Sequence, residues 1–128
     1  MKRLIYIILF ICTSCASTVI EPNLTTNNDK LVIENKELEY EVIIIEPGFN
    51  SWLVTQMPMS YYSQPTLELK NTFFITSWNQ RVLQPFKYNT NLYEMRIDYD
   101  SQIDYGLEVN YKLFMYFTYF QQKYKQKL

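Results

Sequence analysis

Residues 104–125 read DYGLEVNYKLFMYFTYFQQKYK, with large apolar side chains recurring at helical spacing. Asp104 can cap the start of a helix there, because its carboxylate accepts hydrogen bonds from the first backbone amides. Lysines close the segment, where positive charge favours the helix dipole. Charged and amide side chains interrupt the apolar face, so this helix would not span a membrane. We therefore predict a core helix from about Tyr105 to Lys125, with this apolar stripe: Val109, Leu113, Tyr116, Phe117, Phe120 and Tyr124.

The pattern predicts a second helix from about Gln64 to Leu83. Ser63 followed by Pro65 suits a helix start, because proline in the first turn loses no intrahelical hydrogen bond. Pro85 would end the helix. A strand over residues 72–77, which are rich in β-branched and aromatic side chains, is the alternative. The apolar positions that favour the helix fall on one face: Leu67, Phe74, Trp78 and Val82.

Two strands are predicted as well. Residues 38–45 alternate and then become apolar on both faces, which is typical of a strand that is solvated at its start and buried at its end. Pro47 and Gly48 favour a turn after it. Residues 92–99 alternate apolar and charged side chains, which predicts a half-buried strand.

A short helix through residues 52–54 is expected between the first strand and Pro58, with Asn50 or Ser51 as its cap. The order strand, helix, helix, strand, helix predicts an α+β fold. We expect a small sheet of two or three strands packed against about three helices. The expected core residues are Phe74, Trp78, Phe117 and Phe120.

The N-terminus has the layout of a secretory signal: a short basic start, an apolar run over residues 4–12, and small polar residues before Cys15. The run is too short to span a bilayer, which needs about 20 residues. It resembles the lipobox of bacterial lipoproteins, in which the signal is cut before a cysteine that becomes acylated, although Cys12 stands where leucine is usual. We predict a signal peptide over residues 1–14 and a lipid anchor on Cys15. An ordinary cleaved signal with an incidental thiol is the alternative.

The rest of the chain is expected to form a tether and one domain, as its length of 128 residues suggests. Residues 15–37 are polar and contain few apolar side chains, so we predict a flexible tether there. An edge strand at residues 31–33 is the alternative. The single α+β domain then covers residues 38–128.

Composition excludes several classes of protein. Twelve basic against thirteen acidic residues leave a net charge of −1, which does not suit a nucleic-acid binder. The chain has no histidine, so the usual general base and the commonest metal ligand are missing, and two cysteines provide no disulfide framework. After loss of the signal the charge would be −3, and an anionic bilayer would not attract such a domain as a whole.

A run of aromatic, amide and guanidinium side chains could line a groove for a sugar or a peptide. The same side chains could instead satisfy buried backbone groups. The possible ligand or partner contacts are Trp78, Asn79, Arg81, Tyr105, Asn110 and Tyr111.

Acidic residues near the last helix are candidates for a calcium site or for hydrolysis. Their spacing fails the EF-hand pattern, and helix capping explains them well, so we expect no metal and no cofactor. Glu94 and Asp98 could serve a hydrolase, but Arg96 between them would lower both pKa values and favours ion pairing. The acidic residues considered for calcium are Asp98, Asp100, Asp104 and Glu108.

The chain from Leu38 to Leu128 resembles an uncharacterised family of short, tyrosine-rich lipoproteins of Bacteroidota-type bacteria. The resemblance rests on residues 41–49 (EVIIIEPGF), 78–82 (WNQRV), 97–99 (IDY) and 104–111 (DYGLEVNY). It implies a setting in the bacterial cell envelope and no known activity.

Residues 16–19 lack the acidic cluster usual in surface-exported lipoproteins of such bacteria, so an outer-membrane position facing the periplasm is expected. The favoured hypothesis is a membrane-anchored, non-catalytic interaction or structural module that binds another envelope protein. A periplasmic glycan- or peptide-binding module is the alternative, and a carboxylate-dependent hydrolase is less favoured.

Overall fold

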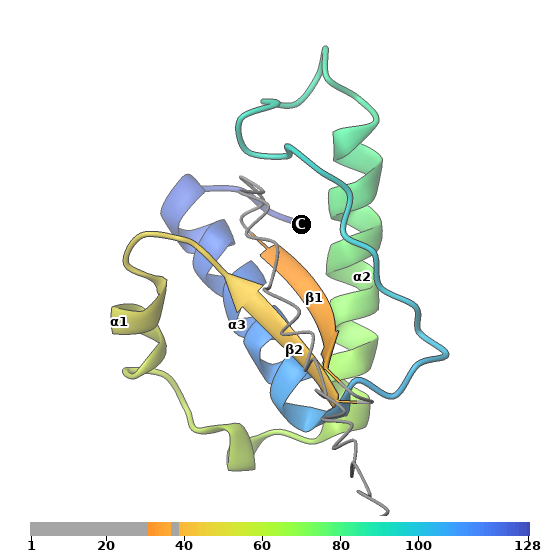
Figure 1. The fold of residues 1–128 in the computed structure, drawn as a ribbon. Coiled ribbons are helices and arrows are strands. Elements are labelled where there is room, and N and C mark those ends of the chain that lie inside the picture. Colours follow the sequence, from red (N-terminus) through yellow and green to blue (C-terminus); the bar gives the residue numbers. More distant parts are fainter. Residues whose placement is uncertain (1–30, 37–38) are drawn as a thin grey trace, which may run out of the picture.

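The computed structural model describes residues 31–36 and 39–128. It is an α+β fold with one two-stranded antiparallel sheet and three α-helices (Figure 1). The predicted signal peptide, Cys15 and the first part of the predicted tether lie outside the described residues. The elements in chain order are β1 (Leu31–Lys36), β2 (Glu39–Ile44), α1 (Phe49–Leu53), the 3-10 turn η1 (Met59–Tyr61), α2 (Gln64–Val82) and α3 (Gly106–Tyr124).

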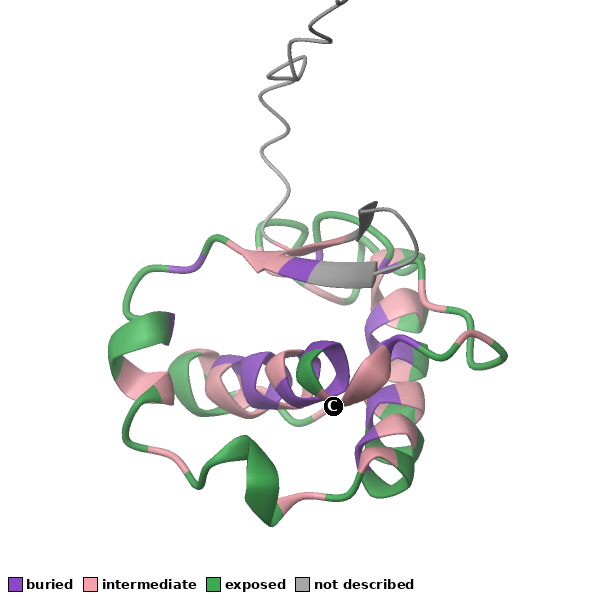
Figure 2. Ribbon diagram, turned by 60° about the horizontal axis from the view of Figure 1, so that its bottom comes forward, coloured by how far each residue is buried: buried purple, intermediate pink, exposed green. Residues whose placement is uncertain are grey.

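Helix α3 is the central element, and it confirms the helix predicted for residues 105–125. Figure 2 shows it in the middle of the molecule, with the β1–β2 hairpin over it and with α1 and α2 on opposite sides. A helix that is surrounded in this way has to bury more than one face. Accordingly, its buried residues are Val109, Asn110, Tyr111, Leu113, Met115, Tyr116, Phe117 and Phe120.

Helix α2 confirms the second predicted helix and excludes the alternative strand at residues 72–77. The β-branched residues that suggested a strand fit the helix because their hydroxyls bond to its backbone: Thr72 donates to the carbonyl of Glu68, and Thr76 donates to that of Thr72. On the predicted apolar face, Leu67 and Trp78 are buried. Two other residues of that face, Phe74 and Val82, are half-buried.

Helices α2 and α3 run parallel to each other. At their starts Gln64 donates to the carboxylate of Asp104, and at their ends Arg81 donates to the carbonyl of Lys127. In between, the rings of Trp78 and Phe120 lie 4.8 Å apart. A parallel pair needs a connection that returns the length of the helix, and residues 83–105 provide it.

The prediction of a strand at residues 92–99 is wrong. These residues form an irregular connection that runs back beside α2 (Figure 1). The predicted alternation of buried and exposed side chains is observed only in part. Tyr93 and Ile97 are buried, whereas Met95, which was expected on the same side, is 54% exposed. No neighbouring strand is present in the described part of the chain to pair with this backbone, and side chains of α2 bind it instead.

The hairpin confirms the strand predicted at residues 38–45, which is β2. Residues 31–36, which the sequence analysis placed in the tether with a short edge strand as the alternative, form β1. Ile33 is paired with Val42, and Leu31 with Ile44, and these side chains pack towards the core. Pairing with β2 satisfies the β1 backbone, which composition alone does not reveal.

The ends of two helices differ from expectation. Helix α1 begins at Phe49, earlier than predicted, and Gly48 occupies its N-cap with φ of 84°. The turn predicted at Pro47 and Gly48 agrees with the positive φ of Gly48. The prediction that Asn50 or Ser51 caps the helix is wrong. In α3 the N-cap is Tyr105, and Asp104 accepts a hydrogen bond from the amide of Gly106 at 3.0 Å.

Candidate functional site

Trp78 was predicted to line a ligand groove, and the structure places its indole in the core, 5% exposed. Its ring packs edge-on against Tyr93 and Phe120, with ring centres 5.0 and 4.8 Å away. Its Nε1 donates a hydrogen bond of 2.8 Å to the carbonyl of Met95. Trp78 therefore binds the connection between α2 and α3.

Asn79 binds the same connection through both ends of its amide. Its Nδ2 donates to the carbonyl of Ile97 at 2.9 Å, and its Oδ1 accepts from the amide of Ile97 at 2.8 Å. This geometry reproduces the pair of hydrogen bonds that a neighbouring strand would offer. The side chain thus replaces the missing sheet partner of residues 92–99.

Arg81 lies against the same segment and the end of the chain. Its guanidinium stacks near the rings of Tyr88 and Tyr93, 4.9 and 5.4 Å from their centres. It donates to the hydroxyl of Tyr93 at 2.6 Å and to the carbonyl of Lys127. Arg81 therefore ties the C-terminal end of α2 to that of α3.

Asn110 is fully buried at the interface of α2 and α3. Its Oδ1 accepts from Tyr99 at 2.9 Å and from Asn71 at 3.2 Å, and its Nδ2 donates to the carbonyl of Gly106. Burial raises the pKa of Tyr99 to about 12, and the nearby Glu68 charge adds to the effect. The network specifies how the two helices and the connection fit together.

The two remaining predicted contacts also bind the chain itself. The hydroxyl of Tyr105 accepts from the amide of Asp100 at 3.0 Å. Tyr111 donates to the carbonyl of Met57 at 2.8 Å, and burial raises its pKa. The six predicted residues are therefore spread along α2, α3 and their connection. Each of them has a polar group bonded to another part of the fold.

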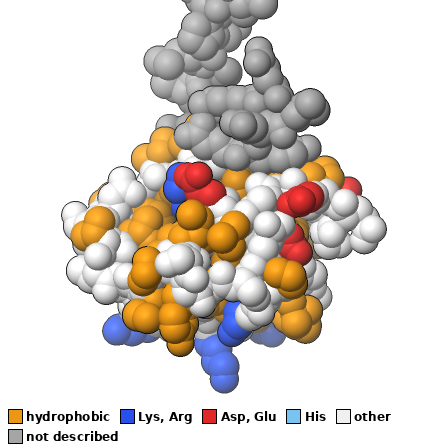
Figure 3. Space-filling view, turned by 90° about the horizontal axis from the view of Figure 1, so that it is seen from below, with side chains coloured by type: hydrophobic (Ala, Val, Ile, Leu, Met, Phe, Trp, Pro, Cys, Tyr) orange, Lys and Arg blue, Asp and Glu red, His pale blue; other side chains and the backbone are white. Residues whose placement is uncertain are grey.

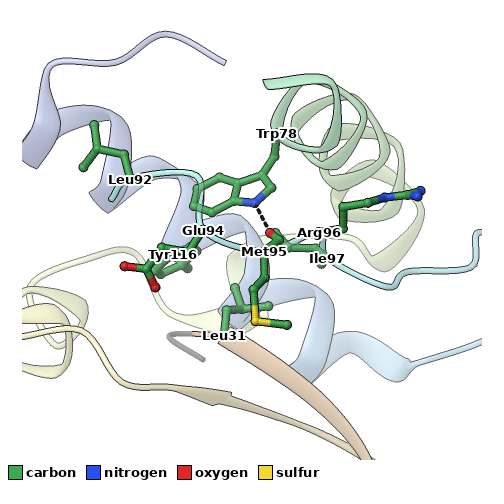
Figure 4. A pocket seen from close by; sticks show the side chains of 8 residues that line it. All are labelled: Leu31, Trp78, Leu92, Glu94, Met95, Arg96, Ile97 and Tyr116. Atoms are coloured by element: carbon green, nitrogen blue, oxygen red, sulfur yellow. Dashed lines mark hydrogen bonds between the residues drawn. The ribbon is translucent and has the colours of Figure 1, made fainter. Parts of the chain in front are cut away.

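A small cavity of about 30 Å³ lies between β1, α2, α3 and residues 92–97 (Figure 4). A water molecule needs about 10–15 Å³ of such volume, so the space has room for about two waters. Burial, together with the charge of Glu46, raises the pKa of Tyr116, which reaches the cavity from α3. The residues that line the cavity are Leu31, Trp78, Leu92, Glu94, Met95, Arg96, Ile97 and Tyr116.

A buried ion pair at the C-terminal end of α3 was not predicted from the sequence. The side chain of Glu46 is 1% exposed, and its Oε1 accepts from Lys123 at 2.6 Å and from Tyr124 at 2.7 Å. The hydrogen bond to Glu46 raises the pKa of Lys123 to about 12. A carboxylate directly after the apolar end of a strand was the available signal in the sequence. The pair joins the hairpin to the end of α3.

The acidic residues that were weighed for calcium do not converge. Asp98 and Asp100 lie exposed on the connection. Asp104 accepts hydrogen bonds from the amide of Gly106 and from Gln64, and Glu108 pairs with Lys112 on α3 at 2.7 Å. In the part of the chain that the structure describes, there is no group of three or more potential ligands that could hold a metal. Of the helices described, none is long and apolar enough to cross a membrane.

One face of the molecule is rich in apolar side chains. Figure 3 views the molecule from the end that carries η1 and shows hydrophobic side chains gathered on this face. Segment 54–62 is held there by the bond from Tyr111 to Met57 and by contact of Tyr62 with Phe114. Its exposed apolar residues, which we call the apolar face, are Val54, Met57, Met59 and Tyr61.

The sequence was also compared with known proteins. The profile of a family described as a family of unknown function (DUF6146) matches residues 3–128. No curated protein and no solved structure matches the chain. Since the match covers nearly the whole sequence, the chain belongs to the family of unknown function DUF6146.

Proposed function

We propose that this protein is a lipid-anchored protein of the bacterial envelope whose folded domain acts as a non-catalytic interaction or structural module. The anchor is Cys15, and the expected position is the outer membrane, facing the periplasm. One observation supports the module in particular: the polar side chains that could have formed a ligand groove are bonded to the chain's own atoms. The cavity of about 30 Å³ beside them is too small for a sugar or a peptide.

The anchor is tested by labelling growing cells that express the full chain with an alkyne-bearing palmitate. The wild-type protein is expected to carry the label and to sediment with membranes. Cys15→Ser removes the thiol that is acylated, so it should lose the label. Cys12→Leu is the matched control, because it removes the other thiol of the chain, introduces the residue usual at that position of the lipobox and should keep the label. A labelled Cys15→Ser protein would contradict the anchor.

The interaction module is tested at the apolar face. Methionine side chains are flexible and polarizable and adapt well to a protein partner. A photo-crosslinking amino acid at Met57, which is 50% exposed, should give one dominant adduct in intact cells. The same amino acid at the exposed Gln80 on α2 is the control and should not give it. Identical adducts from both positions, or none from Met57, would contradict a specific partner at this face.

A further inference from the structure

The connection after α2 carries two large apolar side chains that are mostly or fully exposed. Leu83 is 69% exposed and Phe86 is fully exposed. Figure 1 shows this part of the connection projecting beyond the end of α2. An exposed phenylalanine on a projecting loop loses free energy in water and gains it in an apolar environment.

Basic residues lie at the same end of the fold as these two residues. Lys87 follows Phe86 directly, and Arg81 lies in the last turn of α2. The bond from Arg81 to Lys127 brings the end of the chain to the same place. Among the described residues, no carboxylate pairs with Lys87, Lys125 or Lys127, all of which are exposed. We call this region the basic tip, composed of Arg81, Leu83, Phe86, Lys87, Lys125 and Lys127.

The charges of the two long helices are separated along their length. There is no acidic residue in segments 69–93 and 109–128. Glu68, Asp104 and Glu108 lie near the starts of α2 and α3, where the two helices meet. The 19 residues of α2 span about 28 Å, which is several times the screening length of about 8 Å at physiological salt. At the tip end Glu46 is paired with Lys123, and the basic side chains of Arg81, Lys87, Lys125 and Lys127 outnumber Glu94, the acidic residue that follows segment 69–93. The tip therefore keeps a net positive charge, although the net charge of the whole chain is −1.

The chain also enters the described fold at this end. Leu31, the first described residue, pairs with Ile44, and Glu46 two residues later bonds to Lys123 and Tyr124 at the end of α3. Leu31 also lines the cavity together with Leu92, at the start of the extended part of the connection. Leu31 thus lies on the side of the basic tip.

We propose that the basic tip rests on an anionic bilayer surface, with Phe86 and Leu83 in the boundary between headgroups and acyl chains and the lysines at the lipid phosphates. The proposal rests on the lipid anchor proposed above, which would hold this end of the domain near the bilayer. An exposed aromatic side chain next to a lysine, at an end of the molecule that carries further basic residues, is the composition that favours the membrane interface. In this orientation the apolar face at η1 points away from the bilayer.

The test places an environment-sensitive fluorophore on the tip of the lipidated full chain. Phe86→Cys is labelled with a nitrobenzoxadiazole dye after reconstitution into vesicles of phosphatidylcholine with or without phosphatidylglycerol. Phe73→Cys is the matched control, because Phe73 is 66% exposed on the outer side of α2. Both side chains are exposed, so both variants should fold. We expect a blue shift and at least a threefold gain in emission at position 86 in the anionic vesicles only, reversed by salt.

A second variant tests the charges. Lys87→Glu combined with Lys125→Glu should abolish the shift at position 86, whereas Lys70→Glu combined with Lys112→Glu, away from the tip, should leave it intact. An unshifted dye at position 86 in a protein that stays on the vesicles would overturn the orientation and leave the anchor standing. A shift that appears only after addition of an envelope protein extract would also overturn it. Loss of the protein from the vesicles would instead overturn the anchor itself.

Discussion

At the scale of single residues, Gly48 shows how little room the fold leaves at one turn. Its φ of 84° is a conformation that side-chain-bearing residues adopt at a cost of about 1–2 kcal/mol. A Cβ atom there would also lie 2.7 Å from the hydroxyl of Tyr119, which donates to the carbonyl of Pro47. Gly106 has the same φ but open space around it.

Gly48→Ala is therefore expected to lower the free energy of unfolding by about 2–3 kcal/mol, since strain adds to a lost hydrogen bond of about 1 kcal/mol. Gly106→Ala should cost only about 1–2 kcal/mol. In a Tyr119→Phe background the clash is gone, so the cost of Gly48→Ala should fall to that of Gly106→Ala. Denaturant titration of the four variants measures this. Equal costs of Gly48→Ala in both backgrounds would show that Tyr119 has no part in it.

At the scale of elements, the connection between α2 and α3 depends on Asn79. Replacing it by alanine leaves the amide and carbonyl of Ile97 without the partners they have in the structure, and each unmade bond costs about 1–3 kcal/mol. Since the connection can open locally, we expect the Ile97 amide to exchange with solvent about 30-fold faster, which corresponds to about 2 kcal/mol. Hydrogen exchange measured by NMR provides the readout. Gln80→Ala on the exposed side of α2 should leave the Ile97 amide unchanged, and an unchanged rate in Asn79→Ala would refute the role of Asn79.

The elements also show what the sequence could and could not predict. Apolar spacing predicted α2 and α3 because both helices bury a stripe of side chains that repeats along the chain. Alternation at residues 92–99 predicted a strand, and the structure has an irregular connection there instead. A strand is formed only where the backbone pairs with the backbone of another strand. Here the backbone of Ile97 pairs instead with the side chain of Asn79, which lies on α2. The parallel course of the two helices, which makes the extended return necessary, is encoded in contacts far apart in the sequence.

The same limit applies to the candidate site. Trp78, Asn79 and Asn110 were predicted as possible contacts to a ligand or a partner protein, and in the structure their polar groups bind other parts of the chain. Their partners are the carbonyl of Met95, the backbone of Ile97 and the neighbouring helix. Every residue has a backbone amide or carbonyl, so a side chain that binds backbone atoms does not require a particular residue type as its partner. A sequence pattern therefore cannot reveal where that partner lies. The exposure of Phe86 was equally hidden, because the sequence does not tell an exposed aromatic ring from a buried one.

At the scale of the whole molecule, several tyrosines and one lysine hold their protons more tightly in the folded protein than in the unfolded chain. Burial raises the pKa of Tyr99 to about 12 and also raises that of Tyr116. The bond to Glu46 raises the pKa of Lys123 to about 12 from an ordinary value of 10.5. These contributions to stability are present in full below pH 10 and are lost as the pH rises towards 12, because the unfolded chain releases its protons first.

We therefore expect the thermal midpoint to be level below pH 10 and to fall steeply between pH 10 and pH 12. Near-ultraviolet circular dichroism follows the loss of tertiary structure, and the absorbance of tyrosinate follows ionisation in the same samples. The two should change together, because the buried hydroxyls ionise on unfolding. Tyrosinate formation at Tyr99 and Tyr116 without unfolding would contradict the expectation.

The hydrogen bonds from the Asn79 side chain to main-chain atoms affect how related sequences should be interpreted. Every amino acid except proline presents the same amide and carbonyl, so relatives can exchange the residue at position 97 for others while the asparagine has to stay. In an alignment, an invariant asparagine at position 79 beside a variable position 97 would then resemble a catalytic residue, although its role is to hold the connection in place.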